Sequence, residues 1–153
     1  MRAVSGAGWV DPMIEVLRID NLALVESVEL EFGPGLNVLT GETGAGKSII
    51  LAALALLAGG RAAADTLRSG ASEGAVEALF RMDGHADVAH ALAARGLIDE
   101  SLLPGNEGRE LIVRRTLHEN GRSRARVGGE LVPVSTLAEL FGRSEERRVG
   151  KEC

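Results

Sequence analysis

The chain has 153 residues, of which 45% are hydrophobic and 25% charged, so it is long enough to bury a core as one globular domain. Its net charge of −5 excludes a generally basic surface, and any contact with nucleic acid must come from a local patch. The single cysteine, Cys153, excludes a disulfide framework or a cysteine-based zinc site and favours a reducing, cytoplasmic setting.

The first half of the chain predicts a short run of strands. Residues 1–12 have no periodicity and are expected to be a disordered extension. An apolar run then predicts a strand over 14–19, and the alternation of apolar residues with glutamates predicts a half-buried strand over 28–32. After a turn at 33–35, the short apolar run Leu36–Leu39 predicts a buried strand.

Residues 47–58 predict a helix that is apolar nearly all round. A helix without a polar face is expected to be buried on several sides. Gly59 and Gly60 predict its end, since glycine accepts the left-handed conformation that follows a helix. The longest apolar run, Ile49–Ala58, is half of the roughly 20 residues that cross a bilayer, so no membrane span is expected.

The second half predicts strands and two short helices. Alternation over 75–82 predicts a strand, and 86–95 predicts a helix that ends before Gly96. Two strands, 110–117 and 122–127, are expected to form a hairpin around Asn120-Gly121, which is a strong turn signal.

A second turn and a last helix follow the hairpin. Gly128-Gly129 predicts a turn into a strand at Leu131-Val132. Thr136, with Glu139 three residues later, predicts a capping box that opens a helix through Phe141.

Residues 144–153 break this composition, because six of the ten are charged. A solvated helical end is one interpretation, and a non-native run appended to the domain is the other. We expect residues 13–143 to form the folded part.

One motif in the chain matches G-x-x-x-x-G-K-[ST] at every fixed position. Its residues are Gly41, Glu42, Thr43, Gly44, Ala45, Gly46, Lys47 and Ser48. The glycines let successive backbone N–H groups point into one concavity, and the following helix aims its positive end at the same place. Lys47 would meet the β- and γ-phosphates, and the Ser48 hydroxyl would bind Mg²⁺. An apolar run before the motif and an apolar helix after it supply the required context, so the motif predicts nucleotide binding.

Five arginines gather on the predicted hairpin. They are Arg114, Arg115, Arg122, Arg124 and Arg126. Alternate positions on one strand share a face, so these side chains could track the phosphates of DNA. The simpler interpretation, which we favour, is a charged edge that discourages aggregation, because no aromatic side chain is interleaved. The three histidines lack the spacing of metal ligands.

These residues resemble the RecN family, the bacterial DNA-repair ATPases related to the structural-maintenance-of-chromosomes (SMC) proteins. The matching stretches are IDNLALV at 19–25, GLNVLTGETGAGKSIIL at 35–51, LIVRR at 111–115 and GRSRA at 121–125. Together they reach over about 13–142. Ala52 departs from the pattern, because such heads usually carry an acidic residue in that helix.

The resemblance implies an α/β fold, the N-terminal half of an ABC/SMC-type ATPase head with a mixed sheet and a buried helix after the phosphate loop. It implies ATP and Mg²⁺ as cofactors, DNA and a second head of the same kind as partners, and a cytoplasmic, nucleoid-associated role in recombinational repair of double-strand breaks. The family's glutamine loop, coiled coil, signature motif and Walker B carboxylates do not occur in these residues, so we expect the chain to bind ATP without hydrolysing it.

Three alternatives differ from this hypothesis. The chain could be a non-catalytic module that holds DNA or a partner through its arginine-rich hairpin, or it could belong to another SMC- or RecF-like P-loop ATPase. A small P-loop kinase is disfavoured, since no acidic strand end and no arginine-rich lid follow the motif.

Overall fold

The computed structural model describes residues 14–40, 44–63, 65–82, 86–99 and 110–141. The predicted extension at 1–12 and the charged tail at 144–153 lie outside the described residues. The elements are β1 (Ile14–Leu22), β2 (Val25–Glu31), α1 (Gly44–Leu57), β3 (Glu73–Arg81), α2 (Ala86–Ala93), β4 (Glu110–His118), β5 (Ser123–Val127), β6 (Glu130–Val132) and α3 (Val134–Phe141).

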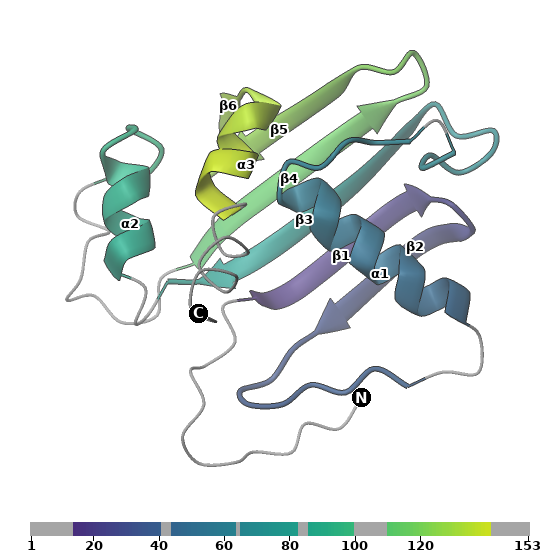
Figure 1. Cartoon of the computed structure of the whole chain (residues 1–153), viewed down its shortest axis with the longest axis horizontal. Coiled ribbons are helices and arrows are strands. Elements are labelled where there is room, and N and C mark those ends of the chain that lie inside the picture. Colours follow the sequence, from purple (N-terminus) through teal and green to yellow (C-terminus); the bar gives the residue numbers. More distant parts are fainter. Residues whose placement is uncertain (1–13, 41–43, 64, 83–85, 100–109, 142–153) are drawn as a thin grey trace, which may run out of the picture.

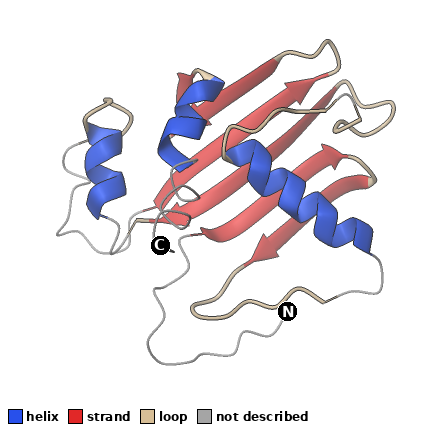
Figure 2. Cartoon of the chain, viewed as in Figure 1, coloured by secondary structure: helices blue, strands red, loops and turns tan. Residues whose placement is uncertain are grey.

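The six strands form one sheet in the order β2-β1-β3-β4-β5-β6, and α1 and α3 lie against the same face of it (Figure 1, Figure 2). Every pairing between these strands is antiparallel, so the parallel component of the predicted mixed sheet does not come from them. The other face of the sheet carries no described helix.

Strict alternation along the strands places the core between the sheet and its helices. Leu17 and Ile19 of β1 are fully buried, whereas Arg18 between them is exposed. In register with Leu17 lie Ala78 of β3 and then Val113 of β4, both also fully buried. One side of each strand thus faces the helices, and the other side faces outward.

The hairpin of β4 and β5 forms where Asn120-Gly121 predicted it. Gly121 adopts a φ of 79°, and its N–H donates to the His118 carbonyl, which closes the turn. Gly128 and Gly129 also have positive φ and turn the chain into β6, as predicted. These turns need residues without a Cβ penalty, which explains why the prediction succeeded.

Three predictions in this part of the fold are wrong. Leu36–Leu39 is not a buried strand: among the named strands it has no partner, and Leu36 is 65% exposed. The helix α1 is not buried on several sides, because Leu51 on its outer face is 68% exposed. The capping box does not open α3, since the helix starts at Val134 and Glu139 pairs with Arg95 instead.

Candidate functional site

The phosphate-loop motif runs into the first turn of α1. Gly41–Thr43 lie outside the described residues, and Gly44–Ser48 form the start of the helix. Lys47 therefore occupies the first turn, as the sequence predicted, and its side chain is exposed. The roles of the eight motif residues in binding stay predictions.

The start of α1 has the electrostatic character of an anion site. The first N–H groups of a helix have no partner within the helix, and the helix dipole places partial positive charge there. No acidic side chain lies in the first turn of α1 to neutralise that charge, and Lys47 adds a full one. A negatively charged group is therefore favoured at this end of the helix.

Open space at Gly46 tests whether a phosphate group fits. A Cβ built on Gly46 would meet no described atom within 4 Å beyond its own stretch of helix. Packing within the described protein therefore does not require glycine at this position. A ligand that approaches the backbone closely would require it, and the residues present thus fit a phosphate group.

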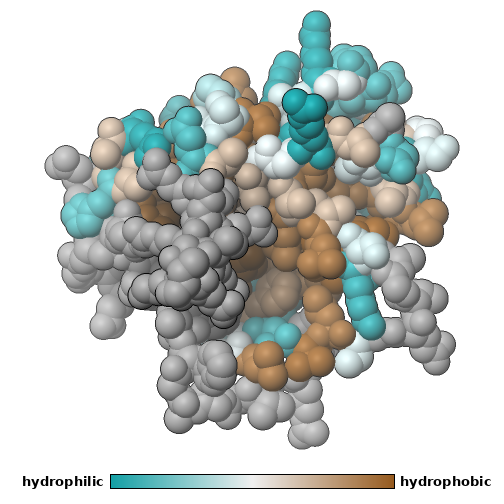
Figure 3. Space-filling view, in the orientation of Figure 1, coloured by the Kyte–Doolittle hydropathy of each residue, from teal (hydrophilic) through white to brown (hydrophobic). Residues whose placement is uncertain are grey.

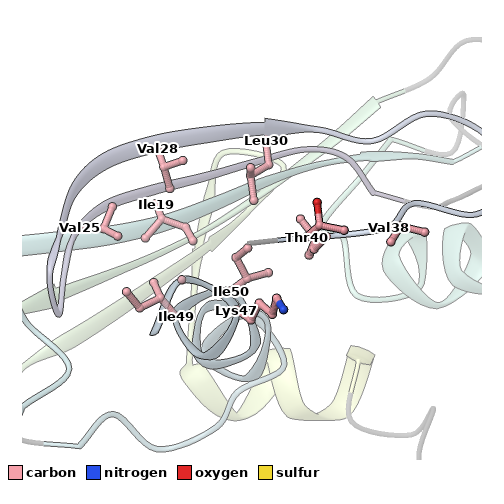
Figure 4. A pocket seen from close by; sticks show the side chains of 11 residues that line it. Ile19, Val25, Val28, Leu30, Val38, Thr40, Lys47, Ile49 and Ile50 are labelled. Atoms are coloured by element: carbon pink, nitrogen blue, oxygen red, sulfur yellow. The ribbon is translucent and has the colours of Figure 1, made fainter. Parts of the chain in front are cut away.

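A cavity of about 400 Å³ lies beside this helix end, between α1 and the β1–β2 hairpin (Figure 4). Ile19, Val28 and Leu30 point from the strands toward Ile49 and Ile50 on the helix. The other residues that line the cavity are Val25, Val38, Leu39, Thr40, Gly46 and Lys47. The first turns of α1 are thus less closely packed on the sheet than its last turns, where Ala53, Leu56 and Leu57 are buried.

The outer side of α1 continues this apolar surface. Leu51 on the helix and Leu36 and Val38 before the loop are half or more exposed. In the space-filling view, hydrophobic surface gathers on this side of the molecule around a hollow (Figure 3). A group of exposed apolar side chains is unusual on the surface of a soluble protein, and it is typical of a place where another protein element packs.

The structure separates the five arginines of the predicted patch. Arg124 and Arg126 of β5 are exposed on the outward face of the sheet, and Arg126 donates to the Gly129 carbonyl at 2.8 Å. Arg114 faces the same way but pairs with Glu77 at 3.0 Å. Arg122 is exposed, but it lies before the first residue of β5. The prediction that it belongs to this strand together with Arg124 and Arg126 is therefore wrong.

A row of charges crosses the outward face, one from each of the five strands β2, β1, β3, β4 and β5. In register from β2 to β5 lie Glu29, Arg18, Glu77, Arg114 and Arg126. Alternate signs hold the first four of these in mutual balance. The basic character of this face is therefore concentrated at β5.

Arg115 is not part of the outward patch, and its assignment as a DNA contact is wrong. It is only 4% exposed and points to the helix face, where its Nη1 donates to the Leu56 carbonyl at 2.8 Å and to the Gly60 carbonyl. Its Nε donates to Ser123 Oγ at 2.9 Å. Alternation along β4 could have revealed this, because Arg115 follows Leu111 and Val113 at the same period of two.

Burial also affects the charge state of Arg115. Desolvation lowers the pKa of its guanidinium, because burial disfavours the charged form. An arginine keeps its charge in proteins even so. The group therefore brings a positive charge to the carboxyl end of α1 at every physiological pH.

Two features are absent from the described residues. Within the described ranges, no cluster of three or more His, Cys, Asp or Glu could hold a metal ion, so a resident metal site is not formed by these residues. No helix among them has the length and apolarity to cross a membrane.

Comparison with known proteins places the chain in a family. The family described as "AAA domain" matches residues 17–147. The DNA repair protein RecN of Vibrio cholerae is 44% identical over 84% of this chain and 22% of its own length, and that of Bacillus subtilis is 39% identical over 84% and 21%. The chain thus spans about a fifth of these relatives.

A solved structure supports the fold. A chain from work on ATP-driven dimerization and DNA-stimulated activation of SMC ATPases matches with a TM-score of 0.65 at 22% identity, over 88% of this chain and 80% of that chain. At this identity the likeness concerns the fold, and it confirms the predicted SMC-type P-loop class. Membership of such a family implies nucleotide binding. The chain therefore belongs to the AAA domain family, and its predicted resemblance to the RecN proteins is confirmed.

Proposed function

We propose that the chain is the ATP-binding segment of a RecN-like DNA-repair ATPase. The observation that carries this proposal is the phosphate-loop motif at the start of α1, with an exposed Lys47, no acidic neighbour in the first turn, and open space at Gly46. The RecN relatives support the biological setting, which for a protein acting on chromosomal DNA is the cytoplasm.

The chain's own residues would hold the nucleotide by its phosphates. The backbone N–H groups of Gly44–Ser48 and the Lys47 ammonium would bind the β- and γ-phosphates, and the Ser48 hydroxyl would hold Mg²⁺. Mg²⁺ held there would supply positive charge that offsets the negative charge of the phosphate oxygens. We expect binding without turnover, because the family's Walker B carboxylates do not occur in this sequence.

The exposed apolar side of α1 would receive the remainder of the ATPase head. Leu36, Val38 and Leu51 are apolar side chains that the described sheet leaves exposed. The run 36–40 has the composition of a buried strand, and it would become one if further strands paired with it. A second head of the same kind would then complete the nucleotide site, which makes the affinity of this segment alone weak.

DNA would contact the outward side of β5. Arg124 and Arg126 lie two residues apart on one strand, and no described carboxylate opposes them in the register of β4 and β5. Arg114 is compensated by Glu77, and the β1–β2 side of the same face is largely acidic. The proposed DNA contact is therefore smaller than the sequence predicted and concentrated at this edge of the sheet.

Titration of the full chain with Mg²⁺-ATP tests the nucleotide proposal. We expect Lys47→Ala to lose roughly 1.5–3 kcal/mol, about ten- to a hundredfold in affinity, because it removes a charge-assisted contact with the phosphates. Arg124→Ala is the matched control, since it removes one exposed positive charge on the opposite face of the sheet. Equal affinities of wild type and Lys47→Ala, or no binding by folded wild type at millimolar ATP, would refute the assignment.

Salt dependence tests the DNA proposal. In fluorescence titrations with a labelled duplex, the slope of log affinity against log salt should fall by about 1 for each of Arg124→Ala and Arg126→Ala, since each removes one phosphate contact. Arg95→Ala serves as the control, because Arg95 pairs with Glu139 of α3 on the helix side. A slope that these β5 variants leave unchanged would rule out a DNA contact there.

A further inference from the structure

Arg115 is the only buried charged side chain in the described part of the chain. It comes from β4, an interior strand that pairs with β3 on one side and β5 on the other. Its guanidinium donates hydrogen bonds to three groups: the Leu56 carbonyl in the last turn of α1, the Gly60 carbonyl just beyond that helix, and the Ser123 hydroxyl on β5. A rigid part of the sheet is thereby tied to the end of the phosphate-loop helix.

Packing alone does not explain an arginine at this position. The neighbours on the same face of β4 are Leu111, Val113 and Leu117, all buried, and an apolar side chain would continue their pattern. A buried charge is costly unless hydrogen bonds and opposite charge compensate it. Here no carboxylate of the described residues pairs with Arg115. The compensation comes from carbonyl groups at the negative end of the helix dipole.

The helix does not need Arg115 in order to end. Gly59 has a φ of 85°, its N–H donates to the Leu56 carbonyl, and the Gly60 N–H donates to the Ala55 carbonyl at 2.8 Å. These two bonds form a Schellman motif, in which the backbone closes the helix by itself. The hydrogen bonds from Arg115 therefore do something else: they connect the helix to the sheet.

The two halves of α1 differ in how they are held. The last turns are buried on the sheet and tied by Arg115, whereas the first turns border the cavity of about 400 Å³ (Figure 4). Lys47 lies roughly 13 Å before Leu56 along the axis, at about 1.5 Å per residue. Ile49 and Ile50 in the first turns pack against the core only as partly buried side chains, so the carboxyl end is the more firmly held of the two ends.

We propose that Arg115 is a positioning residue for the nucleotide site, which it serves by fixing α1 against β4 and β5. The inference rests on the proposed function, because it concerns the affinity of the same site. Arg115 touches no part of that site itself. It acts through the helix, by holding the first turn of α1 where Lys47 and the backbone N–H groups meet the phosphates together.

Titration with Mg²⁺-ATP of the full chain tests this role in three variants. Arg115→Met keeps the length of the side chain without its donors, and we expect its affinity to fall by at least about fivefold, within the range of typical coupling between sites. Arg115→Lys retains a charged donor for the carbonyls and should recover most of the affinity. Val113→Ala, which opens the same buried face but leaves the tie intact, should bind like wild type once folded.

The outcomes separate the inference from the function on which it rests. No binding by folded wild type overturns the proposed function, and the positioning role falls with it. Binding by wild type that Arg115→Met leaves unchanged overturns the positioning role alone. A loss that Val113→Ala shares at equal thermal stability would assign the effect to general destabilisation, and the inference would again be wrong.

Amide hydrogen exchange without nucleotide gives a second measurement. Arg115→Met should speed exchange at Ile49 and Ile50 in the first half of α1, while the amides of β3 keep their wild-type protection. That selective change would support the tie between helix and sheet. A uniform increase over both elements, or no change in α1, would contradict it.

Discussion

The two ends of α1 are built in different ways. At its carboxyl end, Gly59 and Gly60 close the helix, Arg115 ties it to two strands, and Leu56 is buried in the core. At its amino end, Lys47 is exposed and a cavity separates the helix from the β1–β2 hairpin. The carboxyl end is held by contacts within the described part of the chain. The open end carries the phosphate-loop motif, and under the proposed function a ligand and further protein would supply the contacts that it lacks.

Substitution of one buried and one exposed leucine of α1 tests whether the two sides of the helix differ in packing. Leu56→Ala removes a side chain that is 3% exposed and should lower the free energy of unfolding by about 2–5 kcal/mol. Leu51→Ala, the same change on a side chain that is 68% exposed, should stay within about 0.5 kcal/mol of wild type. Urea denaturation of both variants measures the difference.

The same pair sharpens the proposal that the rest of the head docks on α1. In a longer chain that includes this remainder, Leu51→Ala should become destabilising, because Leu51 would then be buried. Equal losses for Leu56→Ala and Leu51→Ala in the present chain would mean that the outer side of the helix is already covered.

Glycine at the closed end should matter more than glycine in an open turn. Gly59 and Gly70 have nearly the same φ, 85° and 82°, so alanine at either pays the left-handed penalty of about 1–2 kcal/mol. A Cβ on Gly59 would also approach the Ala138 backbone nitrogen to 2.6 Å, whereas one on Gly70 would meet nothing within 4 Å. Gly59→Ala should therefore lower the melting temperature clearly further than Gly70→Ala. A larger effect at Gly70 would show that α3 does not press on the end of α1.

Local signals predicted those elements whose partners are close in the sequence. The β4–β5 hairpin was predictable because Asn120-Gly121 specifies the turn and alternation specifies the buried face. The end of α1 was predictable for a similar reason, since Gly59 supplies a conformation that few other residues adopt. In both cases the deciding contacts lie within a few residues of the signal.

Predictions that depended on distant partners failed. An apolar run such as Leu36–Leu39 shows that a segment can be buried, but not whether a neighbouring strand is present to bury it. Glu139 matched a capping box by spacing, yet in the structure its carboxylate pairs with Arg95 at 3.2 Å. Local spacing does not reveal such competition from a residue elsewhere in the fold.

The candidate site shows the same division. The phosphate-loop motif predicted where Lys47 would lie, because the motif and the helix that begins within it are consecutive in the chain. Arg115 was misassigned, because two adjacent arginines were grouped by sequence although alternation turns them to opposite faces. Its acceptors on Leu56 and Gly60 belong to a helix end far away in the sequence, and no local pattern indicates them.

The smallest expected effect concerns the hydrogen bond that orients Arg115. Ser123→Ala removes the Oγ that accepts from Nε at 2.9 Å, and it should cost about 1 kcal/mol, below the roughly 1.5–3 kcal/mol that is usual for a hydrogen bond to a charged group. The cost stays at this level because Ser123 is only half-buried, so water can reach the donor in part, and because Nη1 still holds the Leu56 carbonyl. Lys47→Ala is the matched comparison at the open end. It removes a whole charge, yet it should leave the free energy of unfolding within about 0.5 kcal/mol, since the side chain is exposed and a change at such a site is normally small. Urea denaturation without nucleotide should therefore rank Ser123→Ala below Lys47→Ala in stability, whereas titration with Mg²⁺-ATP should rank them in the reverse order of affinity. If Lys47→Ala proved the more destabilising of the two, the amino end of α1 would already be packed, and the contrast between the two ends of the helix would be lost.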